Sequence, residues 1–170
     1  ERELAGRRHP LLEEGLAWLH RRVPEDSSLG GSWGDARPGN MIWSEFRCAC
    51  VTDFENVAIG PPELDLGWWL MFDRWSHEAF GGPRLPGEPT RDEQRACYAA
   101  CAGREVGDTH WYEVFAALRY TAIVVRVMNR SVARGELPPD QRIWLENPAA
   151  TCLADLLALA PSGSSCAGLS

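Results

Sequence analysis

Three polar residues in the first third of the chain have types and spacings that suit a hard metal ion and an acid–base group. Asp35 lies in the glycine- and proline-bounded stretch GSWGDARPGNMIW, and Asn40 follows it within the same stretch. Asp53 comes directly after the next apolar run. One carboxylate and one amide oxygen side by side suit Mg²⁺, which takes oxygen ligands and keeps several waters. A further carboxylate nearby would accept a proton from a hydroxyl or orient it.

A short hairpin is the element that would bring these residues together. The runs 41–43 and 48–52 predict two strands around a turn at 44–47. Because a hairpin brings its two ends together, we expect Asn40 and Asp53 to be neighbours in space. The loop before the hairpin would then present its own carboxylate to the same cavity. We expect this hairpin to be buried.

The remainder of the chain has helical patterns. Apolar residues recur at helical intervals in five segments, which are 11–19, 63–72, 90–102, 108–135 and 149–159. Thr90 and Glu93 form a capping box, Asp108 is placed to cap the longest helix, and Gly135 is placed to end it. The buried side of that helix is expected to carry Trp111, Phe115, Leu118, Ala122 and Val125. The predicted fold class is α+β and mostly helical.

Composition limits the classes of function. The 170 residues are 45% hydrophobic and 24% charged, which is typical of a globular domain with its own core or a large piece of a bigger fold. The net charge of -7 argues against nucleic-acid binding. No long apolar run or signal peptide is present, so we expect a cytoplasmic protein without membrane contact. The six cysteines lack zinc-site spacing, and Cys97 and Cys101 are expected to pack as small apolar groups.

The motif order D-x-x-x-x-N followed by D-F-E is similar to that of the catalytic half of protein kinases. With "WGDARPGNMIW", "VTDFENVAIGPPELDLGWWL" and the helical remainder, the chain resembles the C-terminal lobe of the aminoglycoside phosphotransferase and choline kinase-like superfamily. Within this superfamily, the motifs resemble those of bacterial members akin to the kinase-like domain of some acyl-CoA dehydrogenases. The resemblance implies a protein kinase-like C-terminal lobe over residues 1–160, with a small β-hairpin carrying the catalytic loop. Residues 161–170 are expected to form a disordered tail.

The resemblance also implies residue roles. Asp35 would be the catalytic base or would orient the attacking hydroxyl. Asn40 and Asp53 would bind Mg²⁺ that bridges the phosphates of ATP or, alternatively, GTP. Asp65 would be a structural acid that hydrogen-bonds the backbone of the catalytic loop.

Two departures from the family pattern affect this interpretation. Trp33 stands before Gly34, at the position where the family has histidine. Trp33 and Gly34 would both support the catalytic loop, but the loop must pack differently around a tryptophan than around a histidine. All 17 basic residues are arginine, and the chain has neither a lysine nor a G-x-G-x-x-G motif. Kinase chemistry needs both, and in kinases an N-terminal lobe provides them. We therefore expect a missing N-terminal lobe in the full-length protein; a stand-alone remnant is the other interpretation.

The predicted activity is that of an ATP-dependent small-molecule kinase, which moves the γ-phosphate of a nucleotide to a hydroxyl acceptor. The alternative is a non-catalytic kinase-like module with a binding or regulatory role. The acidic balance favours a cationic acceptor such as an aminosugar or choline, whereas the resembling subgroup favours hydroxylated acyl compounds. The sequence does not decide between them.

Several further residues keep two interpretations. Arg37 receives no role, and Glu55 is either a second metal ligand or a solvated loop acid. Three tryptophans either belong to the core or line an acceptor pocket, and these are Trp68, Trp69 and Trp75. The arginines of the segment 119–130 are interpreted most simply as a solvated helix flank rather than as substrate ligands.

Overall fold

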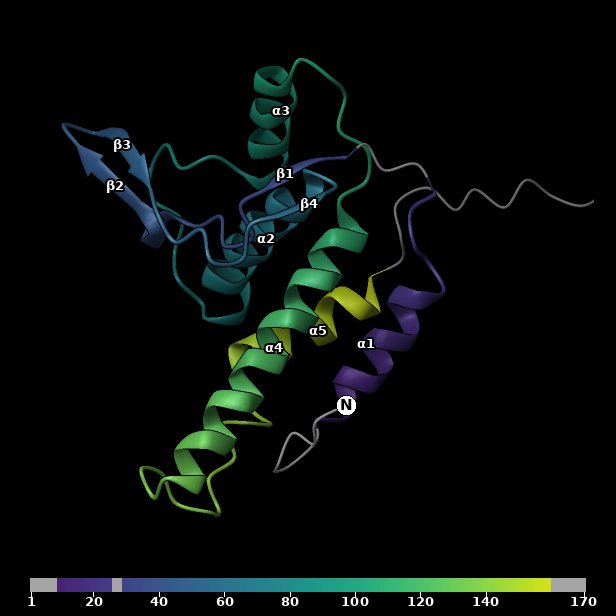
Figure 1. The fold of residues 1–170 in the computed structure, drawn as a ribbon, viewed down its shortest axis with the longest axis vertical. Coiled ribbons are helices and arrows are strands. Elements are labelled where there is room, and N and C mark those ends of the chain that lie inside the picture. Colours follow the sequence, from purple (N-terminus) through teal and green to yellow (C-terminus); the bar gives the residue numbers. More distant parts are fainter. Residues whose placement is uncertain (1–8, 26–28, 160–170) are drawn as a thin grey trace, which may run out of the picture.

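The computed structural model describes residues 9–25 and 29–159. The tail expected at 161–170 lies outside the described residues. The helical elements are α1 (Pro10–His20), η1 (Pro38–Asn40, one 3-10 turn), α2 (Glu63–Arg74), η2 (Trp75–Ala79, one π turn), α3 (Arg91–Ala102), α4 (His110–Ala133) and α5 (Pro148–Ala158). The strands are β1 (Gly30–Ser32), β2 (Met41–Ser44), β3 (Arg47–Val51) and β4 (Ala58–Gly60). The prediction of a mostly helical α+β fold is confirmed (Figure 1).

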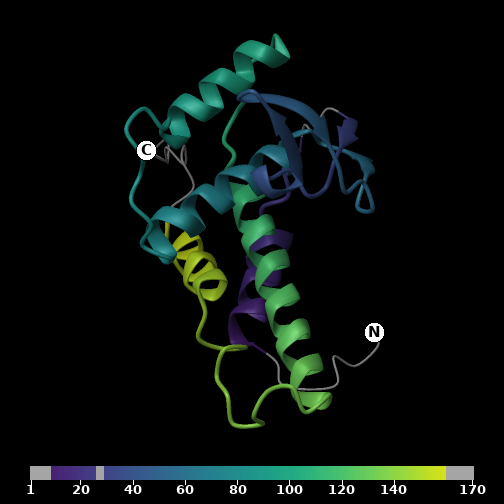
Figure 2. The same cartoon turned by 90° about the vertical axis from the view of Figure 1, so that its left-hand side faces the viewer.

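The long helix α4 is the centre of the fold. It packs against α2, α5 and α1, which lie alongside it in both Figure 1 and Figure 2. The helices meet in one apolar core, whose buried members are Trp18, Leu19, Trp68, Met71, Val114, Ala116, Ala117, Cys152, Leu153 and Leu156. Burial of this apolar surface is the main source of stability for the helical body.

The crossing of α2 and α4 is unusually close because it occurs at a glycine. A Cβ atom added at Gly67 would lie 2.6 Å from the carbonyl carbon of Tyr112, so α4's backbone occupies the space of a side chain. This contact fixes α2 against α4. The first turns of α2 are therefore held in a defined position relative to the first turn of α4.

The predicted ends of the helices agree with local hydrogen bonds. Thr90 and Glu93 form the expected capping box at the start of α3. The Asp108 carboxylate accepts a hydrogen bond from the backbone N–H of His110, the first residue of α4, at 3.0 Å. The N-cap residue of α4 is Thr109, one position after the expected Asp108, and its side chain makes no capping bond. Gly135 has φ +73° directly after α4 and ends that helix.

The expected buried side of α4 is only partly correct. Val125 is fully buried, but the other four residues predicted for that side are only partly buried. The most buried positions of the helix include Val114, Ala117 and Thr121. Because α4 is covered by helices on more than one side, its buried surface is wider than the single stripe that an amphipathic pattern indicates.

The strands form two separate antiparallel pairs. Strand β2 pairs with β3 through a two-residue turn, Glu45–Phe46, in which both residues have positive φ angles of 49° and 62°. Strand β1 pairs with β4, with Gly30 opposite Gly60, and this second pair was not expected. Both pairs flank the loop that contains Asp35.

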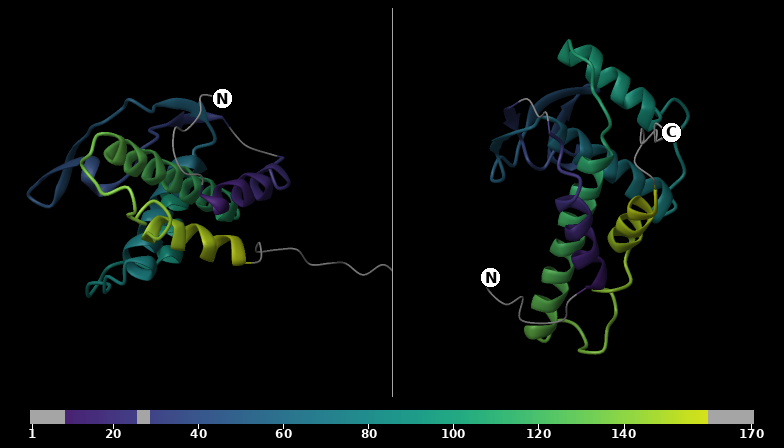
Figure 3. Two further views of the ribbon diagram at one scale, coloured as in Figure 1. Left: turned by 90° about the horizontal axis from the view of Figure 1, so that it is seen from below. Right: turned by 90° about the vertical axis from the view of Figure 1, so that its right-hand side faces the viewer.

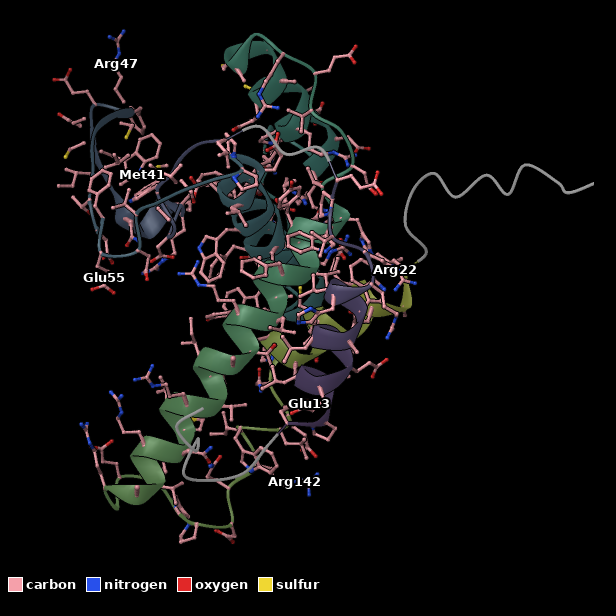
Figure 4. All side chains as sticks on the ribbon, turned by 45° about the vertical axis from the view of Figure 1, so that its right-hand side comes forward. Glu13, Arg22, Met41, Arg47, Glu55 and Arg142 are labelled. Atoms are coloured by element: carbon pink, nitrogen blue, oxygen red, sulfur yellow. The ribbon has the colours of Figure 1, made fainter. Side chains whose placement is uncertain are left out.

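The prediction that the β2–β3 hairpin is buried is wrong. All five residues of β3 and three of the four in β2 are exposed. Figure 1 shows the hairpin projecting away from the helices, and Figure 4 shows Arg47 at its outer end. The apolar pattern of these strands marks a surface suited to burial, but none of the described helices covers it.

Helix α3 lies at one end of the molecule, away from α1 and α5 (Figure 3). It contains no fully buried residue, and the expectation that Cys97 and Cys101 pack as small apolar groups is wrong because both are exposed. The two cysteines instead help line a cavity of about 690 Å³ between α2 and α3. In the described part of the chain, no helix combines the length and the apolar character needed to cross a bilayer.

Candidate active site

The loop between β1 and β2, which carries Asp35, is fixed to the first turn of α2 by a single carboxylate. Asp65 accepts hydrogen bonds from the backbone N–H of Trp33 at 2.6 Å and from that of Gly34 at 2.7 Å. The hydroxyl of Ser32 also donates to it at 3.1 Å. Bonds to an ionised acceptor are stronger than neutral ones, so this residue sets the path of the loop. Asp65 thus makes the contacts expected of a structural acid.

Gly34 allows the loop to turn close to the segment after β3. Its φ angle is +88°, a conformation that only glycine adopts at little cost. A Cβ atom at this position would lie 2.4 Å from the carbonyl oxygen of Asn56. Both the angle and the space therefore require glycine immediately before Asp35.

Asp35 and Asn40 are in direct contact. The Asn40 side chain is buried, and its Nδ2 donates to Asp35 Oδ2 at 2.6 Å and to the Asp35 backbone carbonyl at 3.0 Å. The short η1 turn brings the two residues together. Since the amide nitrogen is used in these bonds, the amide oxygen of Asn40 is left without a partner among the described residues.

The segment that carries Asp53 is joined to Asn40 by a backbone hydrogen bond. The N–H of Thr52 donates to the carbonyl oxygen of Asn40 at 2.9 Å, so the two ends of the hairpin meet as predicted. Asp53 itself has a φ angle of +63° and an exposed side chain. Within the described ranges its carboxylate makes no hydrogen bond or ion pair, to Asn40 or to any other residue. The structure therefore joins Asp35 to Asn40 and brings Thr52, the residue before Asp53, to the same place, while the Asp53 carboxylate is exposed and bonds neither of them.

Trp33 packs across the end of β3. Its indole N–H donates to the carbonyl oxygens of Thr52 at 2.8 Å and Asp53 at 3.2 Å, and its ring lies 6.0 Å from that of Phe54. The tryptophan thereby links the loop that holds Asp35 to the segment that holds Asp53.

The Asp35 carboxylate is surrounded by hydrogen-bond donors. Arg37 Nε lies 3.0 Å from Oδ2, and Trp68 Nε1 donates to Oδ1 at 2.8 Å. Burial by itself would raise the pKa of Asp35, but the hydrogen bonds from Arg37, Asn40 and Trp68 and the charge of Arg37 outweigh it and lower the pKa below its usual value. Asp35 is therefore ionised at neutral pH.

The model of the phosphotransferase enzyme family matches residues 1–97, more than half of the chain. The chain belongs to the phosphotransferase enzyme family. The sequence resemblance to this superfamily is thereby confirmed, and the matched region contains Asp35, Asn40, Asp53 and Asp65.

Individual relatives of this phosphotransferase-family chain agree with that assignment. Acyl-CoA dehydrogenase family member 11 of Pongo abelii is 28% identical over 120 residues, which cover 65% of this chain and 15% of the relative. A solved structure of a candidate aminoglycoside phosphotransferase from Ralstonia eutropha JMP134 superposes with a TM-score of 0.69 at 23% identity, over 91% of this chain and 48% of that one. The solved relative shows a shared fold. The chain spans about half the length of the solved relative and a smaller part of the curated one.

The phosphotransferase-family chain has a cavity of about 290 Å³ at Asp35. Besides the loop residues, its lining comes from α2 and α4, and these residues are Trp68, Phe72, Arg119, Tyr120 and Ile123. The contributions of α4 were missed from the sequence. The available signal was a single arginine, Arg119, within an otherwise apolar stretch of the helix.

The interpretation of the arginines of 119–130 as a solvated flank fits Arg126 and Arg130, which are exposed, but is wrong for Arg119. Its Nη1 donates to the carbonyl oxygen of Gly34 at 2.8 Å, and its guanidinium lies 4.6 Å from the ring centre of Trp68. Trp68 is in turn both a core residue, with 4% exposure, and a donor to Asp35. Of the other two tryptophans, Trp75 packs against the core and Trp69 lines the larger cavity.

A second group of potential metal ligands lies in that larger cavity. Asp73, His77 and Glu88 offer ligand atoms within 4.8 Å of one another. The oxygens of Asp73, however, are occupied by Arg84 at 2.5 and 2.9 Å and by Gln94 at 2.8 Å. The group is therefore an ion-pair network that ties the segment before α3 to α2, and His77 takes part in it through Glu88 at 2.9 Å.

Replacing Trp68 by phenylalanine is expected to raise the pKa of Asp35. The variant removes the indole N–H that helps hold this pKa below its usual value. An ionised Asp35 stabilises the folded state above its unfolded pKa, and this contribution is lost as pH falls through the folded pKa; in the variant the loss begins at higher pH. An NMR titration of the carboxyl carbon measures the change. Trp69→Phe, which removes an indole bond to Gln94 instead, should leave the titration of Asp35 unchanged.

Proposed function

We propose that this chain is the catalytic and acceptor-binding lobe of an enzyme that moves the γ-phosphate of a nucleotide to a hydroxyl of a small molecule. The observation that carries the proposal is the Asp35–Asn40 contact, and the backbone hydrogen bond from Thr52, the neighbour of Asp53, to Asn40 supports it. Membership of the phosphotransferase enzyme family supports it.

In this proposal Asp35 orients the acceptor hydroxyl for in-line attack and receives its proton. Its lowered pKa keeps it in the carboxylate form that this role needs. Arg37, which pairs with the same carboxylate, is 42% exposed at its side chain and is free to move aside when a hydroxyl binds. The adjoining cavity gives the acceptor a place next to this carboxylate.

The donor set at the hairpin end fits Mg²⁺. The Asn40 amide oxygen and the Asp53 carboxylate are hard oxygen ligands, and neither is engaged by other described residues. The ion, when bound with ATP or GTP, would neutralise charge on the nucleotide phosphates. Glu55, which lines the cavity and is exposed, keeps both of its interpretations.

The proposal assigns the remaining parts of a kinase site to a further lobe of the full-length protein. The chain contains no lysine that could contact the phosphates, and phosphoryl transfer of this type uses one. We therefore propose that a lobe outside this chain provides the lysine and the loop that covers the nucleotide.

The test is phosphoryl transfer by the full-length protein over a panel of hydroxyl acceptors, with Mg²⁺ titrated. Asp53→Asn is expected to lower the turnover on the order of 10²-fold and to raise the Mg²⁺ concentration required, because the metal loses its charged ligand. Asp140→Asn, an exposed acid in the segment between α4 and α5, is the matched control and should behave as the wild type. An unchanged Mg²⁺ requirement in Asp53→Asn would contradict the metal assignment. Nucleotide binding without transfer to any acceptor would favour the non-catalytic alternative.

A further inference from the structure

Arg119 is a partly buried cation without an acidic partner among the described residues. It makes one hydrogen bond, to the neutral carbonyl of Gly34, and it lies over the face of Trp68. Arg37 at the same cavity differs, because it forms an ion pair with Asp35. The guanidinium of Arg119 therefore has donors that are not used within the described residues.

Withdrawing such a charge from water is unfavourable unless a counter-charge is supplied. The carbonyl bond and the cation–π contact offset only part of this, since neither is an ionic partner. The planar fork of arginine suits a carboxylate or phosphate, which it binds through two parallel hydrogen bonds. Because Arg119 lines the cavity at Asp35, a ligand in that cavity would supply the missing negative charge.

The size and walls of the cavity restrict the ligand. Its volume of about 290 Å³ lies just below the usual range for small-molecule pockets. Trp68 connects the two charged groups: the indole N–H donates to Asp35, and the face of the same ring contacts Arg119. A ligand that reaches both groups needs a hydroxyl and an anionic group separated by only a few bonds.

We propose that Arg119 binds an anionic group of the acceptor, so that the acceptor is a short hydroxycarboxylate. This inference rests on the proposed function and adds the substrate class to it. It sets aside the cationic acceptor that the overall charge of -7 favours, because the charges that line a cavity determine its ligand more directly than the net charge does. Glu55 also lines the cavity, but it is exposed and its charge is well solvated.

Direct binding to the full-length protein without nucleotide tests the inference apart from catalysis. The probes are 3-hydroxybutanoate, its neutral amide 3-hydroxybutanamide, and choline, each measured by calorimetry. We expect the carboxylate to bind at least about tenfold more tightly than the amide and choline. Equal binding of carboxylate and amide, or preferential binding of choline, would overturn the inference.

Arg119→Gln is the decisive variant, because glutamine can still donate to Gly34 but carries no charge. It should weaken binding of 3-hydroxybutanoate at least about tenfold and leave the amide unaffected. Arg119→Lys keeps the charge without the fork and should retain the preference for the carboxylate at lower affinity. Glu55→Gln, which removes a negative charge from the same cavity, should bind the carboxylate as tightly as the wild type or more tightly. Should Arg119→Gln fail to fold, the wild-type preference and Arg119→Lys still decide.

The transferred phosphoryl group is the other source of negative charge that Arg119 could bind. The second arm of the experiment therefore measures Mg²⁺–ATP binding to the same variants. If Arg119→Gln weakens Mg²⁺–ATP binding but not that of 3-hydroxybutanoate, the anion is the phosphoryl group and the acceptor assignment is overturned. If the carboxylate preference is absent, only the acceptor assignment is overturned and the proposed function stands. The proposed function has a separate test, which is the turnover and the Mg²⁺ dependence of the Asp53→Asn variant.

Discussion

Asp35→Asn is expected to lower the turnover of the full-length protein on the order of 10³-fold, with nucleotide binding nearly unchanged. The carboxamide has the size of the carboxylate but cannot receive the proton of an attacking hydroxyl, and general base catalysis contributes about 10²- to 10⁴-fold. The nucleotide would be held by the metal and by the rest of the protein, so its affinity should not depend on this residue. Initial rates and a separate nucleotide-binding titration measure the two effects.

A control must separate the loss of the base from the loss of its ion pair. Arg37→Gln removes the same ion pair while leaving the Asp35 carboxylate in place. This variant should keep most of the turnover and shift the acid limb of the pH profile upward, since Arg37 helps to lower the pKa of Asp35. Equal losses in the two variants would mean that Asp35 acts through its ion pair and not as a base.

The features that sequence reasoning predicted well are local. The predicted hairpin forms and brings Thr52, the neighbour of Asp53, to Asn40, and Asp35 contacts Asn40 within the same loop. Likewise, the capping box at Thr90 and the glycine after α4 act within a few residues of the helix ends that they fix. Such features depend on neighbours in the chain, so residue types and spacing are enough to predict them.

The features that were missed depend on distant pairs. Arg119 contacts Gly34 across 85 positions, and an amphipathic pattern shows that a helix is buried without showing which loop it meets. Strands β1 and β4 have three residues each, too short for an alternating pattern to be visible. The exposed hairpin belongs to the same class of error. An apolar strand indicates a surface suited to burial but does not identify the segment that covers it.

Asp65 was identified from its local motif, but its contacts are with a loop that is distant in sequence. Of the variants considered, replacement of Asp65 should have the largest effect on stability. Asp65→Ala is expected to lower the free energy of unfolding by about 3 kcal/mol, because two backbone N–H groups lose an ionised acceptor that folding keeps from water. Those groups belong to Trp33 and Gly34, the residues directly before Asp35. The loop should therefore loosen, and turnover should fall together with stability. Urea-induced unfolding followed by tryptophan fluorescence measures the first effect.

Two further variants test whether this loss comes from the loop contacts. Asp92→Ala removes an acid whose side chain is 85% exposed, and it should change the free energy of unfolding little. Asp65→Asn keeps the shape of the side chain, but its amide nitrogen would face one of the two backbone N–H groups, so its stability should lie between those of the wild type and the alanine variant. If Asp65→Ala were as stable as Asp92→Ala, the carboxylate would not be what holds the loop to α2. The position of Asp35 would then have to come from its own bonds to Asn40 and Trp68.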